Sequence, residues 1–157
     1  MGVMGKALSE RLEQTRFEGP VHEALLNVLV AAGYLNEQGA RIFGEHELSP
    51  AQYNVLRILK GAHPDGYARC DIARRMIERA PDLTRMIGRL ERRGLVERAR
   101  SDADRRRSVT RISRRGLELV ERLTPAVAAY HRLVSRRLSA VEAGTLSKLC
   151  EKLYATE

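Results

Sequence analysis

Two long stripes of apolar residues, one near each end of this 157-residue chain, constrain its fold more than any other feature. The first runs from Val21 to Ile42 in steps of three and four, which predicts a helix of about six turns with one apolar side. The second runs from Val120 to Leu138 and includes Pro125, where we expect a kink. A narrow stripe of this kind must pack against another helix to leave water. The pattern therefore predicts a mainly α-helical protein.

The region between the stripes has shorter elements. Ser49 and Gln52 form a capping box that encloses Pro50, so a helix begins there and ends near Gly61. Two brief helices follow, and after Gly94 the pattern changes to two short strands joined by a polar loop. Two short helices and a two-stranded ribbon are typical of a winged helix-turn-helix with a small β-wing. The predicted elements are helices over 6–17, 21–42, 50–60, 69–76 and 81–93, strands over 95–99 and 108–112, and two further helices capped by Ser113 and Ser139.

The basic charge of the protein is concentrated in its middle third. The net charge is +8, but residues 69–115 hold 16 arginines, no lysine and 7 acidic residues, a net charge of +9, and the rest of the chain has a net charge of −1. Such localisation is typical of a nucleic-acid-binding module on a neutral scaffold. The alternative is a compositional preference for arginine that only produces a solvated basic face.

The predicted helix over 81–93 carries polar residues opposite its apolar side. Arginine can bridge the acceptors of guanine in a major groove, and threonine can contact a thymine methyl group or a phosphate. We therefore predict a recognition helix; the alternative is a solvated helix whose arginines pair with neighbouring acids. The candidate DNA-contacting residues are Pro81, Asp82, Thr84, Arg85, Gly88, Arg89 and Arg92.

The loop between the predicted strands has a carboxylate among guanidinium groups. Asp104 can hold a neighbouring arginine in a fixed rotamer while another arginine reaches outward. A narrow minor groove attracts such an arginine, and the remaining charges can neutralise phosphates. A basic hairpin tip with no defined target is the alternative. The candidate wing residues are Arg98, Arg100, Asp104, Arg105, Arg106 and Arg107.

These motifs in this order resemble the MarR (multiple antibiotic resistance regulator) family of winged-helix transcriptional regulators. The residues that carry the resemblance are Ile72-Ala73, Leu83-Thr84-Arg85, Arg89-Leu90-Glu91, Gly94-Leu95-Val96, Arg98, Asp104-Arg105-Arg106, Ile112-Ser113 and Gly116. The resemblance implies that Arg106 enters the minor groove, that Asp104 orients the wing, and that residues 81–89 read bases.

The same resemblance implies an obligate homodimer. Its winged domain would comprise residues 49–112, and the helices of residues 1–48 and 113–157 would interlock with those of a second copy. The implied dimerisation residues are Val127, Tyr130, Val134, Leu138, Leu146, Leu149 and Leu153.

The chain departs from the family pattern in three places. Residues 77–80 lack the Gly and Ser cap that relatives commonly have in this turn, and Ser113 stands where Thr is usual. Gly88 replaces a residue that is often acidic. Glycine could bend the helix or let its backbone approach DNA more closely, at a cost of up to about 1 kcal/mol relative to alanine.

Other chemistry has little support in the sequence. The two cysteines, Cys70 and Cys150, are too far apart for a disulfide framework or a metal knuckle, and no cysteine stands where the family's peroxide sensors have theirs. The four histidines are scattered, so we expect no metal site and no cofactor. No catalytic triad, membrane span or secretory signal is recognisable. We expect a cytoplasmic protein that is not an enzyme.

The resemblance also implies an effector pocket lined by the helix over 50–60. Tyr53 and Asn54 are the candidates for contacting a small phenolic or anionic molecule. The alternative is that Tyr53 belongs to the core and that Asn54 is solvated or bonded to its own helix.

We therefore expect a homodimer that binds a pseudo-palindromic double-stranded operator and represses, or less often activates, transcription. Two alternatives stay open: a sequence-independent architectural DNA- or RNA-binding protein, and a protein-interaction module that has lost DNA binding.

Overall fold

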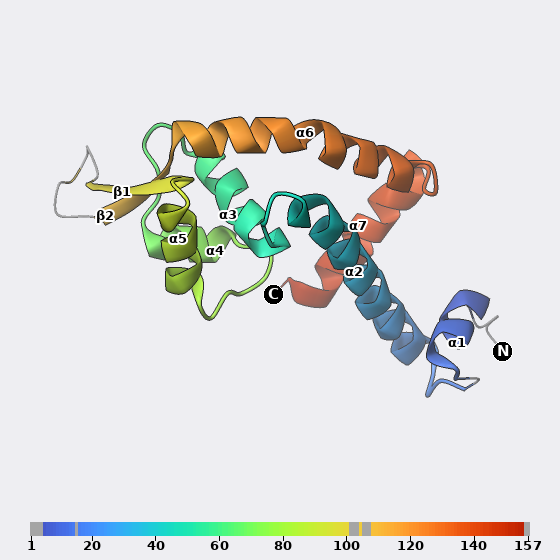
Figure 1. Cartoon of the computed structure of the whole chain (residues 1–157). Coiled ribbons are helices and arrows are strands. Elements are labelled where there is room, and N and C mark those ends of the chain that lie inside the picture. Colours follow the sequence, from blue (N-terminus) through green and yellow to red (C-terminus); the bar gives the residue numbers. More distant parts are fainter. Residues whose placement is uncertain (1–4, 15, 101–103, 105–107, 156–157) are drawn as a thin grey trace. The chain divides into compact units, whose positions relative to one another are not determined.

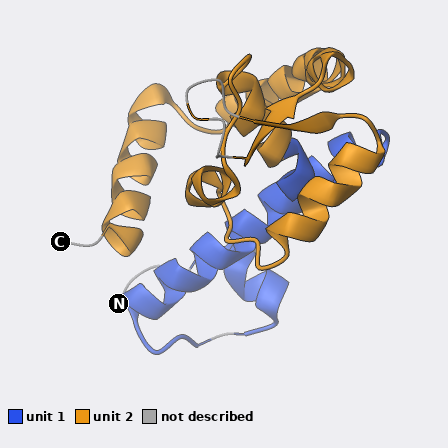
Figure 2. Ribbon diagram, turned by 90° about the vertical axis from the view of Figure 1, so that its left-hand side faces the viewer, with its two compact units in different colours: residues 1–53 blue, residues 54–157 orange. Residues whose placement is uncertain are grey.

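The computed structural model describes residues 5–14, 16–100, 104 and 108–155 and is mainly helical with one small antiparallel ribbon (Figure 1). This arrangement confirms the predicted fold class. The chain forms two compact units, residues 1–53 and residues 54–157, which are coloured separately in Figure 2. The elements are α1 (Lys6–Leu12), α2 (Pro20–Gly44), α3 (Pro50–Gly61), α4 (Arg69–Arg75), α5 (Leu83–Arg92), β1 (Val96–Arg100), β2 (Ser108–Ile112), α6 (Arg114–Ser135) and α7 (Ala140–Tyr154).

The N-terminal unit is built around the long helix α2. Pro20 occupies its first turn, where the missing N–H costs no hydrogen bond, and the helix extends for 25 residues. Helix α1 ends at Leu12, earlier than predicted, because Glu13 has a left-handed backbone with φ of 50°. The backbone N–H of Gly5 donates a hydrogen bond of 2.7 Å to Glu23 Oε1, so the start of α1 is tied to the first turn of α2.

Hydroxyl caps begin three helices, as predicted. At the start of α3, the Ser49 hydroxyl accepts from the Gln52 N–H, and the Gln52 side chain accepts from the Ser49 N–H. Ser139 and Glu142 form the same reciprocal box before α7, and Ser113 caps α6. The backbone N–H and the hydroxyl of Ser139 both hold the pKa of Glu142 below its ordinary value, because they stabilise the ionised carboxylate.

The core of the C-terminal unit joins the short helices to the ribbon. Strands β1 and β2 pair antiparallel, with Val96 opposite Ile112, and Tyr67 adds a single bridge to Thr110. The buried side chains of the described part of this unit are Val55, Leu56, Leu59, Ile72, Leu83, Ile87, Leu90, Leu95, Val96, Val109, Thr110, Ile112, Leu119, Val120 and Leu123. Burial of these mainly apolar groups from helices and strands fixes the ribbon against α5.

Helix α5 begins two residues later than the sequence predicted. Pro81 does not open it; Pro81 and Asp82 form a turn in which the Leu83 N–H donates to the Ala80 carbonyl. Asp82 has a non-helical backbone and makes no side-chain cap. The helix ends at Arg92, one residue before the predicted end, and Gly94 follows with φ of 66°, a conformation that favours glycine.

Other predicted boundaries also differ from the structure by small amounts. Strand β1 covers Val96–Arg100 and is shifted by one residue. Helix α6 continues through Pro125 but ends at Ser135, so Leu138 lies in the connection to α7 and not on the helix that was predicted to carry it. A hydrogen bond from the Arg137 N–H to the Val134 carbonyl tightens this turn before the Ser139 cap.

Candidate nucleic-acid interface

Helix α5 presents two different sides. Leu83, Ile87 and Leu90 are buried and anchor it to the core. The other side carries the predicted DNA-contacting residues of this helix. Thr84, Arg85, Arg89 and Arg92 are exposed there, and Gly88 is half-buried. Pro81 and Asp82 are exposed as well, in the turn before the helix. The structure therefore brings the polar candidates together on one accessible surface.

The arginines near α5 take part in exposed ion pairs. Arg85 Nε lies 3.3 Å from Asp82 Oδ2, and Arg98 Nε lies 3.2 Å from Glu91 Oε2. Exposed pairs of this kind contribute little to stability, so a phosphate or a base edge can replace the carboxylate at small cost. The Arg98 pair joins β1 to α5.

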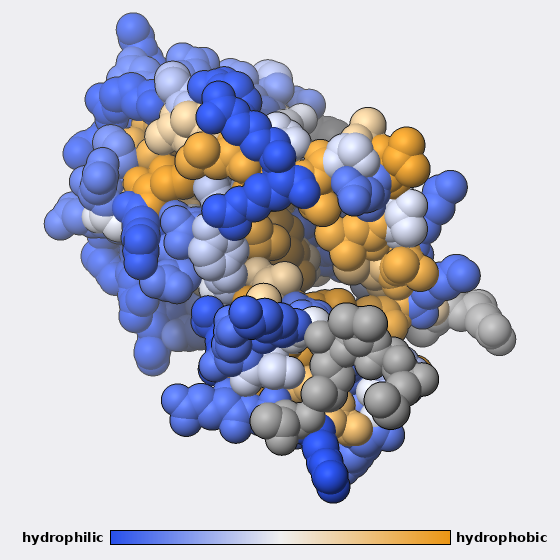
Figure 3. Space-filling view, turned by 90° about the vertical axis from the view of Figure 1, so that its right-hand side faces the viewer, coloured by the Kyte–Doolittle hydropathy of each residue, from blue (hydrophilic) through white to orange (hydrophobic). Residues whose placement is uncertain are grey.

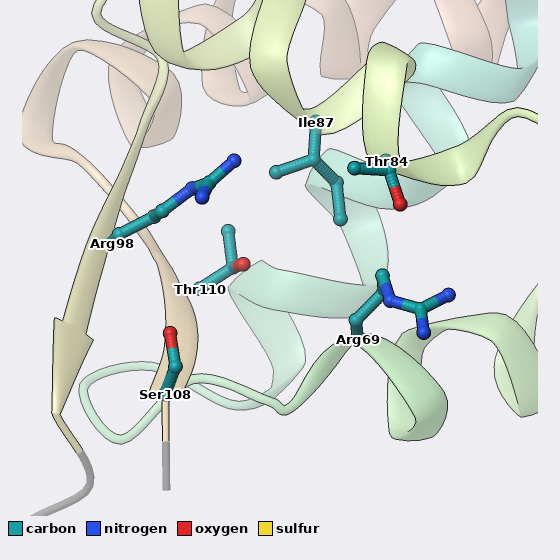
Figure 4. A pocket seen from close by; sticks show the side chains of 6 residues that line it. All are labelled: Arg69, Thr84, Ile87, Arg98, Ser108 and Thr110. Carbon is teal, nitrogen blue, oxygen red and sulfur yellow. The ribbon is translucent and has the colours of Figure 1, made fainter.

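A hollow of about 250 Å³ lies between α5 and the ribbon (Figure 4). Figure 4 shows the Arg98 side chain pointing from β1 across this hollow toward Ile87. The lining residues are Arg69, Thr84, Ile87, Arg98, Ser108 and Thr110. Sequence reasoning singled out Thr84 and Arg98 but missed Arg69, Ser108 and Thr110. Arg69 stands at the edge of the arginine-rich segment, which was the only signal for it.

The turn before α5 is held by α3. Asn54 Oδ1 accepts a hydrogen bond of 3.0 Å from the backbone N–H of Ile77, 23 residues away. The bond ties the segment between α4 and α5 to α3. The guanidinium carbon of Arg75, the last residue of α4, also lies 4.2 Å from the centre of the Tyr67 ring, a cation–π contact to the segment that pairs with Thr110.

The predicted effector residues are both half-buried on α3. Tyr53 stacks on Phe43, with ring centres 4.1 Å apart and planes inclined by 19°. Asn54 faces the turn through its bond to Ile77 and is not bonded through Oδ1 to its own helix. The stacking of Tyr53 and the hydrogen bond of Asn54 account for the positions of both side chains within the fold without any ligand.

The wing tip falls largely outside the described residues. Arg105, Arg106 and Arg107, including the predicted minor-groove residue, are not among them. Asp104 and Arg100 are described and exposed. Their predicted roles at the wing stay predictions.

The predicted dimerisation residues differ in exposure. Val127, Tyr130, Val134 and Leu138 are half-buried. Those on α7 are open: Leu146, Leu149 and Leu153 are 48%, 55% and 56% exposed. Figure 3 shows apolar surface, in orange, open to view on one side of the molecule. Helix α2 likewise exposes Val21, Leu25, Leu29 and Leu35.

The described residues show neither a metal-binding cluster nor a membrane-spanning helix. In that part of the chain, no group of three or more His, Cys, Asp or Glu side chains could hold a metal ion. None of its helices is long and apolar enough to cross a membrane. Cys70 is exposed and Cys150 is half-buried, and both are free thiols.

One family profile and several known proteins match the chain. The profile of the MarR family matches residues 48–108. A protein of Thauera aromatica described as a transcriptional regulatory protein for the hcr operon is 30% identical over 107 residues, which cover 68% of this chain and only 63% of that protein. A crystal structure of a MarR transcription factor from Planctomyces limnophilus is 38% identical, covers 87% of this chain and 98% of that chain, and has a TM-score of 0.65. The PcaV transcriptional regulator of Streptomyces coelicolor, solved in complex with its natural ligand, is 27% identical, covers 87% of this chain and 92% of that chain, and has a TM-score of 0.65.

Proposed function

Because this chain belongs to the MarR family of transcriptional regulators, we propose that it binds double-stranded DNA sequence-specifically and acts as a homodimer on a pseudo-palindromic operator. The family consists of transcription factors and not of enzymes, as the sequence predicted. We assign its place of action to the cytoplasm.

The observation that carries this proposal is the exposed basic side of α5. Arg85, Arg89 and Arg92 are open to solvent on a helix whose other side is anchored by three buried residues. A rigid helix is needed to read base edges, because each arginine must reach the groove in a fixed place. Arg98 and the arginines of the wing loop would neutralise phosphates of the DNA backbone. Arg106 is assigned to the minor groove.

The apolar surface that the single chain leaves exposed supports the proposed dimer. We assign residues 1–48 and 113–157 to dimerisation and residues 49–112 to DNA binding. Leu146, Leu149 and Leu153 recur on one side of α7 and are about half exposed, which is costly for a chain alone in water. A symmetric dimer would present two α5 helices to half-sites about one turn of DNA apart, ~34 Å.

Regulation by release from DNA is the second part of the proposal. The protein represses transcription until a small phenolic or anionic effector, contacting Tyr53 and Asn54, changes the separation of the two winged domains. Both recognition helices could then no longer dock together, and the operator affinity would fall. The ligand-bound relative PcaV supports a search for such an effector.

Selection of binding sites from a random duplex pool, with purified protein at about 150 mM salt, tests the proposal because nonspecific electrostatic binding is weakened there. An enriched pseudo-palindrome would support it and provide an operator for effector screening. Binding without any enriched motif would favour a sequence-independent architectural role. No binding to any duplex would favour a protein-interaction module.

A further inference from the structure

Gly88 is a glycine that the fold of α5 does not require. It lies in the interior of the helix, where glycine is less stable than alanine. Its backbone is not among those with positive φ, so no special conformation calls for glycine. A Cβ atom built at this position meets only one atom within 4 Å, the end of the Arg92 side chain at 3.8 Å, which is ordinary contact. Alanine would fit.

Two other glycines of the same unit, Gly66 and Gly116, are required by close packing. Gly66 has φ of 75°, and a Cβ there would collide with the Thr110 carbonyl and lie 2.8 Å from the Arg111 side chain. A Cβ at Gly116 would collide with the Leu95 carbonyl. Gly88 differs from both. Replacing it with alanine would increase the stability of the helix and would not create a collision.

The place of Gly88 on α5 leaves its backbone accessible to a ligand. It lies one turn from Thr84 and from Arg92 and next to Arg89, on the polar side of the helix. A side chain at this position would stand between the helix and any DNA base that faces it. Without one, the helix backbone itself can come close to a ligand.

The surface that Gly88 offers determines the chemistry it can recognise. In a helix interior the backbone N–H and C=O groups are bonded within the helix, so they are not available to base edges. What remains is the Cα methylene group, which can only make apolar contact. The one apolar feature of the major-groove edges is the C5 methyl group of thymine.

We propose that Gly88 is a specificity-determining residue whose Cα surface receives the methyl group of one thymine in each half-site. The proposal rests on the proposed function, since it requires α5 to enter the major groove. It predicts a preference for T·A over C·G at that position without any hydrogen bond, because cytosine has no methyl group.

Two substitutions, one that removes a methyl group from the DNA and one that adds a methyl group to the protein, test this proposal. Each thymine of the selected operator is replaced in turn by deoxyuridine, which lacks only the methyl group. At one position per half-site the affinity should fall about fourfold, the effect of exposing one methyl-sized group. Gly88→Ala should weaken binding to the thymine operator by about tenfold, and deoxyuridine at that position in both half-sites should recover most of the loss, because the two alanine methyl groups then fill the vacated spaces.

Two controls separate this result from simpler causes. Gly144→Ala adds a methyl group at an open position of α7, away from the side that carries Leu146 and Leu149, and should leave DNA affinity unchanged. Thermal unfolding should show that Gly88→Ala is at least as stable as the original protein, so weaker binding would not reflect unfolding.

The outcomes distinguish the inference from the function on which it rests. If Gly88→Ala binds the thymine operator as well as the original protein, or if no deoxyuridine position recovers its loss, the role of Gly88 is refuted. In that case Arg85→Ala would still weaken operator binding if α5 reads DNA. If Arg85→Ala has no effect either, the proposed function of α5 fails as well.

Discussion

Gly116, the third residue of α6, lies against the end of the turn that follows α5, and its replacement by alanine should destabilise the winged domain. A Cβ atom there would fall well inside contact distance of the Leu95 carbonyl oxygen and would lie 2.7 Å from a side-chain carbon of Ile112. The carbonyl belongs to the backbone, so it cannot rotate away. It also accepts the Ser113 N–H bond that joins α6 to this turn.

The magnitude follows from two opposing effects. Overpacking of a buried position costs about 1 to 3 kcal/mol. The gain in helix propensity from glycine to alanine offsets up to about 1 kcal/mol. Because the nearest obstacle is backbone, we place the overpacking near its upper limit and expect Gly116→Ala to lower the free energy of unfolding by about 2 kcal/mol.

Urea unfolding followed by circular dichroism measures this change. All variants must be compared at one protein concentration, because the stability of a dimer depends on concentration. Gly144→Ala is the matched control: nothing lies within 4 Å of its added Cβ, so it should raise stability by up to about 1 kcal/mol. A midpoint for Gly116→Ala at or above that of the original protein would refute the close approach of α6 to Leu95.

Arg85→Ala should relax the preference for one base pair in each half-site, at a cost of about 1 to 3 kcal/mol, measured on operators that differ at single positions. Arg106→Ala should instead weaken binding to all sequences and reduce the salt dependence of log Kd by about one unit; identical behaviour of the two variants would contradict the assigned roles. Asn54→Ala should lower stability by about 1 kcal/mol, because the Ile77 N–H loses its acceptor, whereas Asn54→Asp keeps an acceptor and should recover most of the loss in urea unfolding. The lowered pKa of Glu142 means that its carboxylate stabilises α7 at neutral pH and that this contribution is lost as the pH falls through that pKa. The Glu142→Gln variant should therefore lose less helicity, measured by circular dichroism, than the original protein between about pH 5 and pH 3. Equal losses in the two proteins would show that the Ser139–Glu142 capping box does not cause the loss of helicity at low pH.

Much of the local structure could be predicted because it depends on neighbours in the chain. The cap of α3 needs only Ser49 and Gln52 at a spacing of three, and the two sides of α5 follow from the period of its apolar residues. The concentration of arginine in residues 69–115 is a property of composition alone. These features made the winged helix and its basic side predictable.

The errors lie where two local signals compete. Pro81 is favourable at the start of a helix, yet it also disfavours a helical backbone in the residue before it, and here the turn extends through Asp82. Leu138 continues the apolar spacing of α6, but the helix ends at Ser135, and the turn before the Ser139 cap takes the next residues. Periodicity alone does not locate such an end.

The sequence by itself determined the order of helices and strands, their caps and the charge of the middle segment, since each depends on residues within a few positions of one another. Only the tertiary structure decided which distant groups meet: Asn54 with the Ile77 N–H, Arg98 with Glu91, and Arg69 with the hollow beside α5. It also decided which glycines are required, because the carbonyl that excludes a side chain at Gly116 belongs to a residue 21 positions earlier. Packing of segments that are remote in sequence creates these contacts, and no local pattern encodes them.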